Sequence, residues 1–275
     1  MTTETLPRPT RTAPTAQPVT LRRVFTSEWI KLRSLRSTQV TLAVAFLLMV
    51  AISVVGATVT THRWPTMSAG SKASFDPTTI ALQGHFVARI AIAVLAVLVI
   101  SGEYATGMIK ATLTAVPRRL PVLWAKCTAF GAVTLVTMTA ASFASFFIAQ
   151  ALLAPNHLQT NLSAPGVLRA VVGTGLYLTA IGLIGVALGT LLRNTAAAIT
   201  ALLGLLMLLP VLLELVTGST GAHITRYLPG YAGEALITVP RHDDFLSPGA
   251  AFATLCAYAV IALAAAAHRL KHRDA

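Results

Sequence analysis

The chain has 275 residues, of which 55% are hydrophobic and only 11% are charged. A soluble domain carries about 25% charged residues, and one soluble core of this length could not cover so much apolar surface. The composition therefore excludes an ordinary soluble enzyme, a disulfide-stapled secreted domain and a disordered chain. It indicates an integral membrane protein.

Basic residues outnumber acidic ones by 21 to 9, which gives a formal net charge of +12. Such an excess is typical of proteins that bind nucleic acid or an anionic surface. Here most cations lie beside apolar runs, which favours lipid and not nucleic acid. Cys127 and Cys256 each lie in an apolar run without Cys-x-x-Cys spacing, so we expect reduced packing residues.

The N-terminal segment, residues 1–20, is rich in Pro and Thr and has no periodicity. We expect it to be a disordered cytoplasmic tail, because it cannot bury apolar area. Ahead of the first long apolar run we find no short apolar stretch with a small-residue cleavage site. That run is therefore predicted to be a retained anchor.

Residues 21–36 are predicted to form an amphipathic elbow helix that lies in the membrane interface. At roughly 100° per residue, one arc collects the apolar residues Leu21, Val24, Phe25, Trp29, Leu32 and Leu35. Glu28 falls inside this arc, whereas Arg33 lies away from it. Two interpretations stay open: a plain anchoring element, or a helix that also contacts a cytoplasmic partner through Glu28 and Lys31.

Six apolar runs have the roughly 20 residues that a helix needs to cross a bilayer. They span residues 39–60, 86–104, 125–152, 170–192, 195–216 and 250–268. A lipid-exposed backbone must satisfy its own hydrogen bonds, and no alternating barrel pattern is present. The sequence therefore predicts an all-α membrane protein, with one transmembrane domain over residues 21–275.

Lys and Arg outside these runs are distributed unevenly. Fifteen of the 21 fall on the side that holds the N-terminal segment, the second-to-third loop (in which Lys126 is counted), the short fourth-to-fifth hairpin with Arg193, and the C-terminal tail. Cytoplasmic loops carry the excess of Lys and Arg, so both termini are predicted to be cytoplasmic. Of the outer loops, residues 217–249 form the longest, and 227–237 within it read as short re-entrant or interfacial helices.

The second-to-third loop has a distinct pattern. The second span is predicted to end at Gly102 and Glu103, and a short helix over residues 106–116 to stop before Pro117. Its charged residues are Glu103, Lys110, Arg118 and Arg119. A plain loop with a positive-inside signature would also carry such charges. A rigid helix projecting from the membrane is instead suited to transmitting force from a soluble motor.

These residues resemble the permease subunits of ABC-2 type ABC transporters. That family has a basic Glu-x-x-Lys segment before the first span, matched by Glu28, Trp29 and Lys31 with Arg33 after them. Its Gly-Glu-Tyr-x-x-Gly segment and the positions that follow are matched by Gly102, Glu103, Tyr104, Gly107, Lys110, Leu113, Pro117 and Arg119. Lys110 stands where Arg is more usual. The resemblance implies a coupling helix in residues 102–119, Arg118 included, and an elbow helix in 21–36.

The same resemblance implies partners. The chain has no Gly-x-x-x-x-Gly-Lys-Ser/Thr loop and no region large enough for a nucleotide-binding domain, so it is not expected to be an enzyme. A separate cytoplasmic ABC ATPase would bind ATP and Mg, and a second permease copy or paralogue would complete the pathway. We expect no cofactor, metal or catalytic residue in this chain. Export is the direction that the family implies.

Polar residues near the spans bear on cargo. His85, Arg89, Arg169 and Glu214 lie near outer boundaries and are expected to be interfacial anchors, although the roles of Arg89 and Glu214 stay open. The absence of charge near the middle of a span argues against proton relays and favours a hydrophobic or amphipathic cargo. Gly185-x-x-x-Gly189 is expected to serve internal packing.

The alternatives are a metal enzyme and a carrier or scaffold that does not use ATP. His242, Asp243 and Asp244 cluster in an outer loop, but a solvated turn is the simpler interpretation because a second His at ligand spacing is missing. A scaffold is compatible with every feature so far. Arg exceeds Lys by 16 to 5, which suggests a GC-rich bacterial genome and hence a bacterial plasma membrane.

Overall fold

The computed structural model describes residues 20–108, 120–239 and 245–272. The predicted N-terminal tail lies outside these residues, and so does nearly all of the predicted helix 106–116. Also outside are the predicted site residues Lys110, Pro117, Arg118 and Arg119 and the polar cluster His242, Asp243 and Asp244. Within the described residues the regular structure is helical, with no strand, which confirms the all-α prediction.

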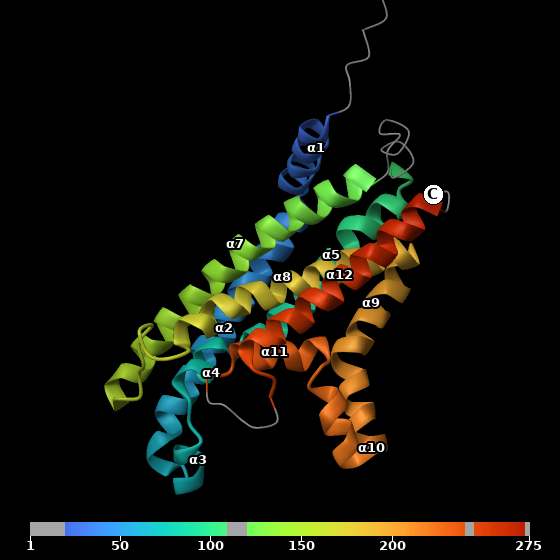
Figure 1. Ribbon diagram of the computed structural model, residues 1–275. Helices are drawn as coiled ribbons and strands as arrows, with labels where there is room; N and C mark the ends of the chain where they lie inside the picture. The colour runs from blue at the N-terminus through green and yellow to red at the C-terminus, as the bar shows by residue number, and fades with distance from the viewer. Residues whose placement is uncertain (1–19, 109–119, 240–244, 273–275) are drawn as a thin grey trace, which may run out of the picture.

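The elements are helices that follow one another along the chain (Figure 1). They are α1 (Leu21–Ser34), α2 (Arg36–Arg63), η1 (Trp64–Thr66), α3 (Ala69–Ala73), α4 (Pro77–Leu82), α5 (His85–Ala105), α7 (Leu120–Leu153), η2 (Ala154–Asn156), α8 (Val167–Leu192), α9 (Thr195–Leu203), the π-helical turn η3 (Gly204–Leu208), α10 (Leu209–Thr225), α11 (Pro229–Ile237) and α12 (Pro248–His272).

Six segments of the described chain are helical, long and apolar enough to cross a membrane, which confirms the predicted spans. The fifth is built from α9, η3 and α10 in succession. Most observed ends lie a few residues beyond the predicted ones. In the third span, helix α7 begins at Leu120 and not at Ala125. Lys126, assigned from the sequence to the preceding loop, therefore lies within α7.

Helix α8 lies at the centre of the bundle, packed against α5, α7 and α12 (Figure 1). Small residues allow this close packing. A Cβ added at Gly185 would come within 2.8 Å of Ala96 Cβ, and one at Gly189 would collide with Ile100. Both neighbours belong to α5. The prediction that this glycine pair serves internal packing is therefore confirmed.

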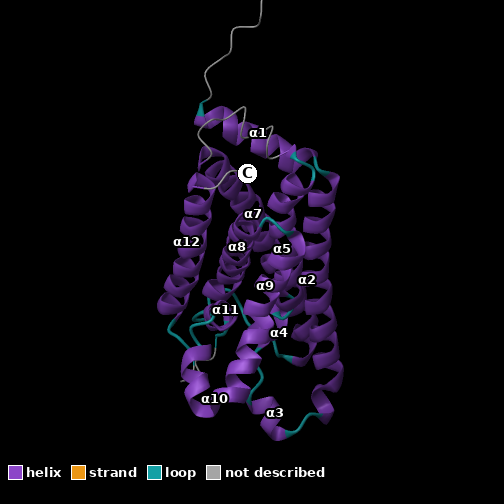
Figure 2. Cartoon of the chain, turned by 90° about the vertical axis from the view of Figure 1, so that its right-hand side faces the viewer, coloured by secondary structure: helices purple, strands orange, loops and turns teal. Residues whose placement is uncertain are grey.

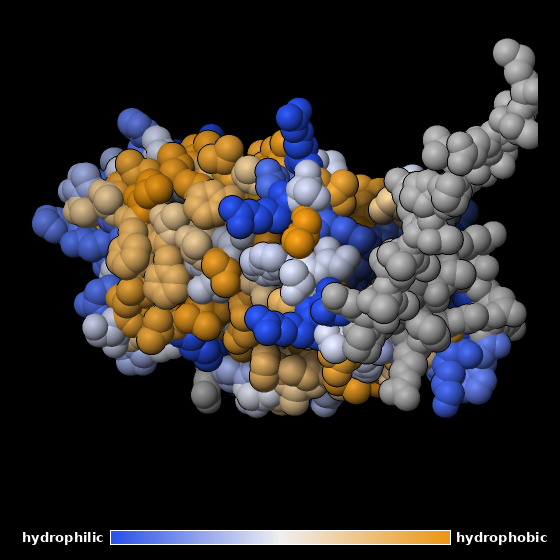
Figure 3. Space-filling model, turned by 90° about the horizontal axis from the view of Figure 1, so that it is seen from above, coloured by the Kyte–Doolittle hydropathy of each residue, from blue (hydrophilic) through white to orange (hydrophobic). Residues whose placement is uncertain are grey.

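Figure 3 shows broad orange, apolar areas on one face of the molecule, with blue, hydrophilic side chains between them. Several of the most exposed apolar side chains belong to α2, α7 and α12, and include Val40, Leu47, Val55, Val136, Val260 and Ile261. A soluble monomer rarely exposes so much contiguous apolar surface. These helices therefore present a surface suited to lipid.

The two ends of the bundle differ. Helix α1 lies across one end of the bundle, which is also the end where the last turns of α12 lie (Figure 2). Helices α3 and α11 and the last turns of α10 lie towards the other. We call these the α1 end and the α11 end. The described parts of the two chain termini thus share the α1 end.

Candidate functional site

Helix α1 is confirmed as a helix, but its buried face differs from the predicted apolar arc. Its buried side chains are Val24, Glu28 and Leu32, which recur every four residues. Val24 packs with Val122 and Ala125 of α7. Phe25 and Trp29, by contrast, are 38% and 39% exposed. An acidic residue thus occupies the middle of the buried face, which requires a cation opposite it.

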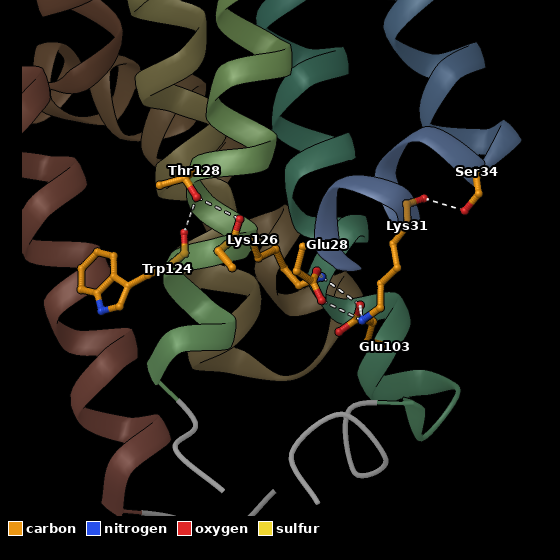
Figure 4. Close-up of polar contacts among 8 residues, drawn as sticks. Glu28, Lys31, Ser34, Glu103, Trp124, Lys126 and Thr128 are labelled. Atoms are coloured by element: carbon orange, nitrogen blue, oxygen red, sulfur yellow. Dashed lines mark hydrogen bonds and ion pairs between the residues drawn. The ribbon is translucent and has the colours of Figure 1, made fainter. Parts of the chain in front are cut away.

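That cation comes from α7. Lys126 Nζ lies 2.7 Å from Glu28 Oε2 and 2.8 Å from Glu103 Oε1 of α5. Lys31 Nζ lies 2.7 Å from Glu28 Oε1 and 3.2 Å from Glu103 Oε1. Figure 4 shows the four side chains converging from three helices. We call Glu28, Lys31, Glu103 and Lys126 the four-charge cluster.

The four-charge cluster is largely withdrawn from water. Glu28 and Lys126 are each 2% exposed and Glu103 is 7% exposed. Two carboxylates alternate with two ammonium groups, so the burial leaves no net charge. Charge-assisted contacts of this length are the strong kind, and removal of one partner would strand a buried charge. The cluster therefore fastens α1 to α5 and α7.

The ion pairs of the cluster shift the pKa values of its two α1 residues, Glu28 and Lys31. Burial acts to raise the pKa of Glu28, but Lys126 and Lys31 outweigh it and hold the pKa below its usual value of 4.5. Burial acts to lower the pKa of Lys31, but Glu28 and Glu103 outweigh it and hold the pKa above 10.5. Both side chains are thus kept in their charged forms.

Helix α5 continues past the cluster before it ends. Its predicted end at Gly102 and Glu103 falls two residues short, because the helix continues to Ala105 with Glu103 held inward. Thr106 N donates to Gly102 O, and Gly107 N donates to Tyr104 O. Gly107 has a φ of +71°, a left-handed conformation that favours glycine and often ends a helix. Glu103 of the cluster therefore lies in the last turn of α5.

The remaining predicted residues at this end take no part in the cluster. Tyr104 is half-buried, with the Arg193 guanidinium 5.6 Å from its ring centre. Trp29 stacks on Phe25, with ring centres 6.3 Å apart. Arg33 is exposed, and its backbone carbonyl accepts a hydrogen bond from Gln39. The roles predicted for these residues remain predictions.

The α11 end holds a second group of ionisable side chains. Glu234 Oε1 of α11 lies 2.9 Å from His85 Nε2 and 3.8 Å from Arg89 Nη1, both on α5. Arg89 Nη1 also donates to the Tyr177 hydroxyl of α8 over 3.4 Å. We call His85, Arg89, Tyr177 and Glu234 the α11-end cluster. His85 and Arg89 are 7% and 6% exposed, so their predicted role as interfacial anchors is wrong.

The other two predicted anchors also contact α11. Arg169 Nη1 donates to Leu236 O over 2.6 Å, and its Nη2 donates to Thr238 O over 2.9 Å. A cation at these carbonyls stabilises the C-terminal end of α11, while the anchoring role of Arg169, which is partly exposed, stays a prediction. Glu214 is exposed, as an anchor would be, and accepts a hydrogen bond from Tyr231 over 2.5 Å. The predicted helix within residues 227–237 is confirmed as α11.

Sequence reasoning missed Lys126, Glu234 and Tyr177. Lys126 was counted only as one of the basic residues at the membrane boundary. The signal that could have found it is Glu28 inside an apolar arc. No comparable signal marked Glu234 or Tyr177. The described residues contain no group of three or more His, Cys, Asp or Glu side chains placed to hold a metal ion.

Comparison with known families agrees with this architecture. The profile of the ABC-2 family transporter proteins matches residues 65–275 and thus includes Glu103 and Lys126, while α1 precedes the matched region. A comparison with curated proteins found no match. Because the match covers most of the chain, the protein belongs to the ABC-2 family transporter proteins and is the membrane subunit of an ABC transporter.

Proposed function

We propose that this chain is the permease subunit of an ATP-driven exporter in a bacterial plasma membrane, with its α1 end in the cytoplasm. Family membership implies an ABC transporter with a partner ATPase. The orientation is supported by the 15 of 21 basic residues on the side of the α1 end. Within this proposal α1 is the elbow helix, and the segment that leaves α5 contains the coupling helix.

The four-charge cluster is the observation that carries the proposal. Glu103 lies one turn before Gly107, where the chain leaves α5 towards the basic residues Lys110, Arg118 and Arg119. Because Glu103 also contacts Lys126 and Lys31, a displacement of that segment would act on α5, α7 and α1 together. A packed, two-sign cluster transmits such a displacement better than a flexible loop does.

The partner would supply the energy. A cytoplasmic ATPase would bind ATP and Mg, since this chain contains no phosphate-binding loop. Closure of the ATPase pair would then push the coupling segments of two permease copies, identical or paralogous, and expose the pathway outward. A cargo that is hydrophobic or amphipathic fits the apolar character of the spans.

The test is purification of the tagged chain in mild detergent from its native host. We expect a stoichiometric cytoplasmic protein that carries a phosphate-binding loop. The reversals Lys110→Glu and Arg119→Glu should each weaken its retention, while Lys271→Glu, a reversal in the last turn of α12, should leave it intact. A folded permease that retains no ATPase would contradict the proposal and favour a carrier or scaffold. If both variants retain the ATPase as well as the wild type does, the assignment of a coupling helix to this segment is contradicted.

A further inference from the structure

A pocket opens at the α11 end between α5, the η3–α10 stretch and α11. Its volume is about 520 Å³, which falls within the roughly 300–1,000 Å³ of small-molecule sites. Phe86, Leu206, Met207 and Val211 give it apolar walls. Its charged lining residues are Arg89 and Glu234. A few polar groups in an apolar pocket are what a ligand site requires.

The local backbone explains why this pocket exists. The π-helical turn η3 widens the fifth span, and π-helical turns are frequent at functional sites. Pro210 follows it and has no N–H to donate to Leu206 O, its partner one helical turn earlier. Gly230 lets α11 approach that carbonyl, since an added Cβ would lie 3.2 Å from Leu206 O. The pocket therefore lies between the irregular backbone of η3 and the backbone of α11, which approaches it closely at Gly230.

Arg89 uses few of its hydrogen-bonding groups. Its guanidinium carries five N–H donors, yet the contacts found are the 3.4 Å bond to Tyr177 and the 3.8 Å approach to Glu234. Its Nε is buried and has no hydrogen-bond partner among the residues that the structure describes. Its Cζ lies 4.1 Å from the centre of the Phe86 ring. A buried cation with unused donors favours an anionic acceptor.

Glu234 does not satisfy that cation. Its Oε1 already lies 2.9 Å from His85 Nε2, and the Arg89 contact is 0.9 Å longer than this one. An anion that enters the pocket can therefore pair with Arg89 while Glu234 keeps His85. We propose that this pocket binds an amphipathic anion, with its carboxylate or phosphate on Arg89 and its apolar tail along Leu206, Met207 and Val211.

The anion has two possible sources, a transported cargo and a resident membrane lipid. Binding to the permease alone depends on neither the ATPase nor the direction of transport. The identification of the ligand with cargo, however, rests on the proposed function. The binding test therefore remains readable even if no ATPase is found.

The experiment measures saturation binding of radiolabelled laurate and dodecyl phosphate to the purified full chain in uncharged micelles, with dodecanol as the neutral probe. We expect both anions to bind more tightly than dodecanol. Arg89→Gln should weaken anion binding by about tenfold or more, as loss of a charge-assisted contact predicts, and leave dodecanol unaffected. Arg63→Gln removes the same charge from an exposed position on α2 and should change nothing.

A second variant guards against misfolding of Arg89→Gln. Val211 lines the pocket and is 51% exposed, so Val211→Trp should block the tail without disturbing the buried ions. This variant should bind both anions more weakly than the wild type, while its size-exclusion elution profile stays unchanged. Equal anion binding to wild type, Arg89→Gln and Val211→Trp would overturn the proposal. So would equal binding of dodecanol and the two anions to the wild type.

Assembly with the ATPase then identifies the source. Release of the bound anion on addition of ATP would identify it as cargo, and retention regardless of ATP as a resident lipid. Either result supports the site. If no ATPase assembles with the permease while Arg89-dependent binding persists, the proposed function fails and the pocket stands.

Discussion

The two ends of the bundle both bury ionisable side chains, but they satisfy them to different degrees. In the four-charge cluster, Lys126 lies within 2.8 Å of two carboxylates, and Lys31 within 3.2 Å of the same two. In the α11-end cluster, the Arg89 contacts measure 3.4 Å and 3.8 Å, and a pocket of about 520 Å³ lies beside them. One cluster is closed and the other is open.

This difference teaches what each group does. Each charge of the four-charge cluster has an opposite charge within 2.8 Å, so the cluster holds helices together and transmits their movement. An unsaturated buried cation still carries part of its desolvation cost, which a ligand can relieve. Both clusters would look the same in a count of charged residues near the membrane boundary. The contact lengths separate them.

The largest expected effect comes from breaking the closed cluster at its centre. Lys126→Met leaves Glu28 and Glu103 with Lys31 as their shared cation, and removal of one partner from a buried pair costs about 3–5 kcal/mol. The thermal midpoint in detergent should therefore fall strongly. Lys271→Met is the control, because Lys271 is exposed near the end of α12. Equal midpoints for the two variants would show that the cluster does not fasten α1.

A smaller effect is expected when the cluster loses the residue nearest the coupling segment. Glu103→Ala leaves Glu28 with both lysines, so insertion and folding should persist. ATP-driven transport in inside-out vesicles should fall by about tenfold while ATP hydrolysis continues, a loss equivalent to about 1.4 kcal/mol in the rate of the coupled step. Glu214→Ala, an exposed carboxylate at the α11 end, is the matched control. Transport at the wild-type rate would rule out a coupling role for Glu103.

Acid should loosen α1 through Glu28. Its pKa is lower in the folded protein than in the unfolded chain, because Lys126 and Lys31 outweigh the opposing effect of burial. This stabilisation is therefore present above the unfolded pKa and is lost as the pH falls through the folded one. The thermal midpoint should drop between about pH 5 and pH 3, and Glu28→Gln should flatten that drop. Parallel curves for the two proteins would place the acid sensitivity elsewhere.

Much of the fold could be predicted because hydropathy and helical period act locally. The six spans and α1 follow from the sequence within a few residues at most ends. Three residues of the four-charge cluster, Glu28, Lys31 and Glu103, were singled out from short motifs. Their mutual contacts were not predicted, since a motif does not say which distant segment lies opposite it.

The residues that sequence reasoning placed wrongly share one physical cause. A long basic side chain at the edge of an apolar run can reach outward to headgroups or inward to a carboxylate. Lys126 and Arg89 both point inward, and their partners lie far away along the chain. Only packing decides between the two directions. Glu28 is the exception, because a carboxylate on an apolar face already requires a cation.

The smallest effect tests whether an exposed contact at the open end also fastens helices. The Tyr231 hydroxyl donates to Glu214 Oε1, and this hydrogen bond raises the pKa of Tyr231 to about 12. The stabilisation by this hydrogen bond should be present below the pKa that Tyr231 has in the unfolded chain. It should be lost as the pH rises through the pKa of Tyr231 in the folded protein. Because Glu214 is exposed to solvent, Tyr231→Phe should cost at most about 0.5 kcal/mol at neutral pH.

Thermal midpoints at pH 7 and over an alkaline series would check this, with Tyr227→Phe, a tyrosine 48% exposed in the same region, as control. Near-equal midpoints at pH 7, with an alkaline drop that only Tyr231→Phe lacks, would agree with the expectation. A loss at pH 7 as large as that of Lys126→Met would contradict it. Contacts at the α11 end would then also hold helices together, and contact length alone would not distinguish the roles of the two clusters.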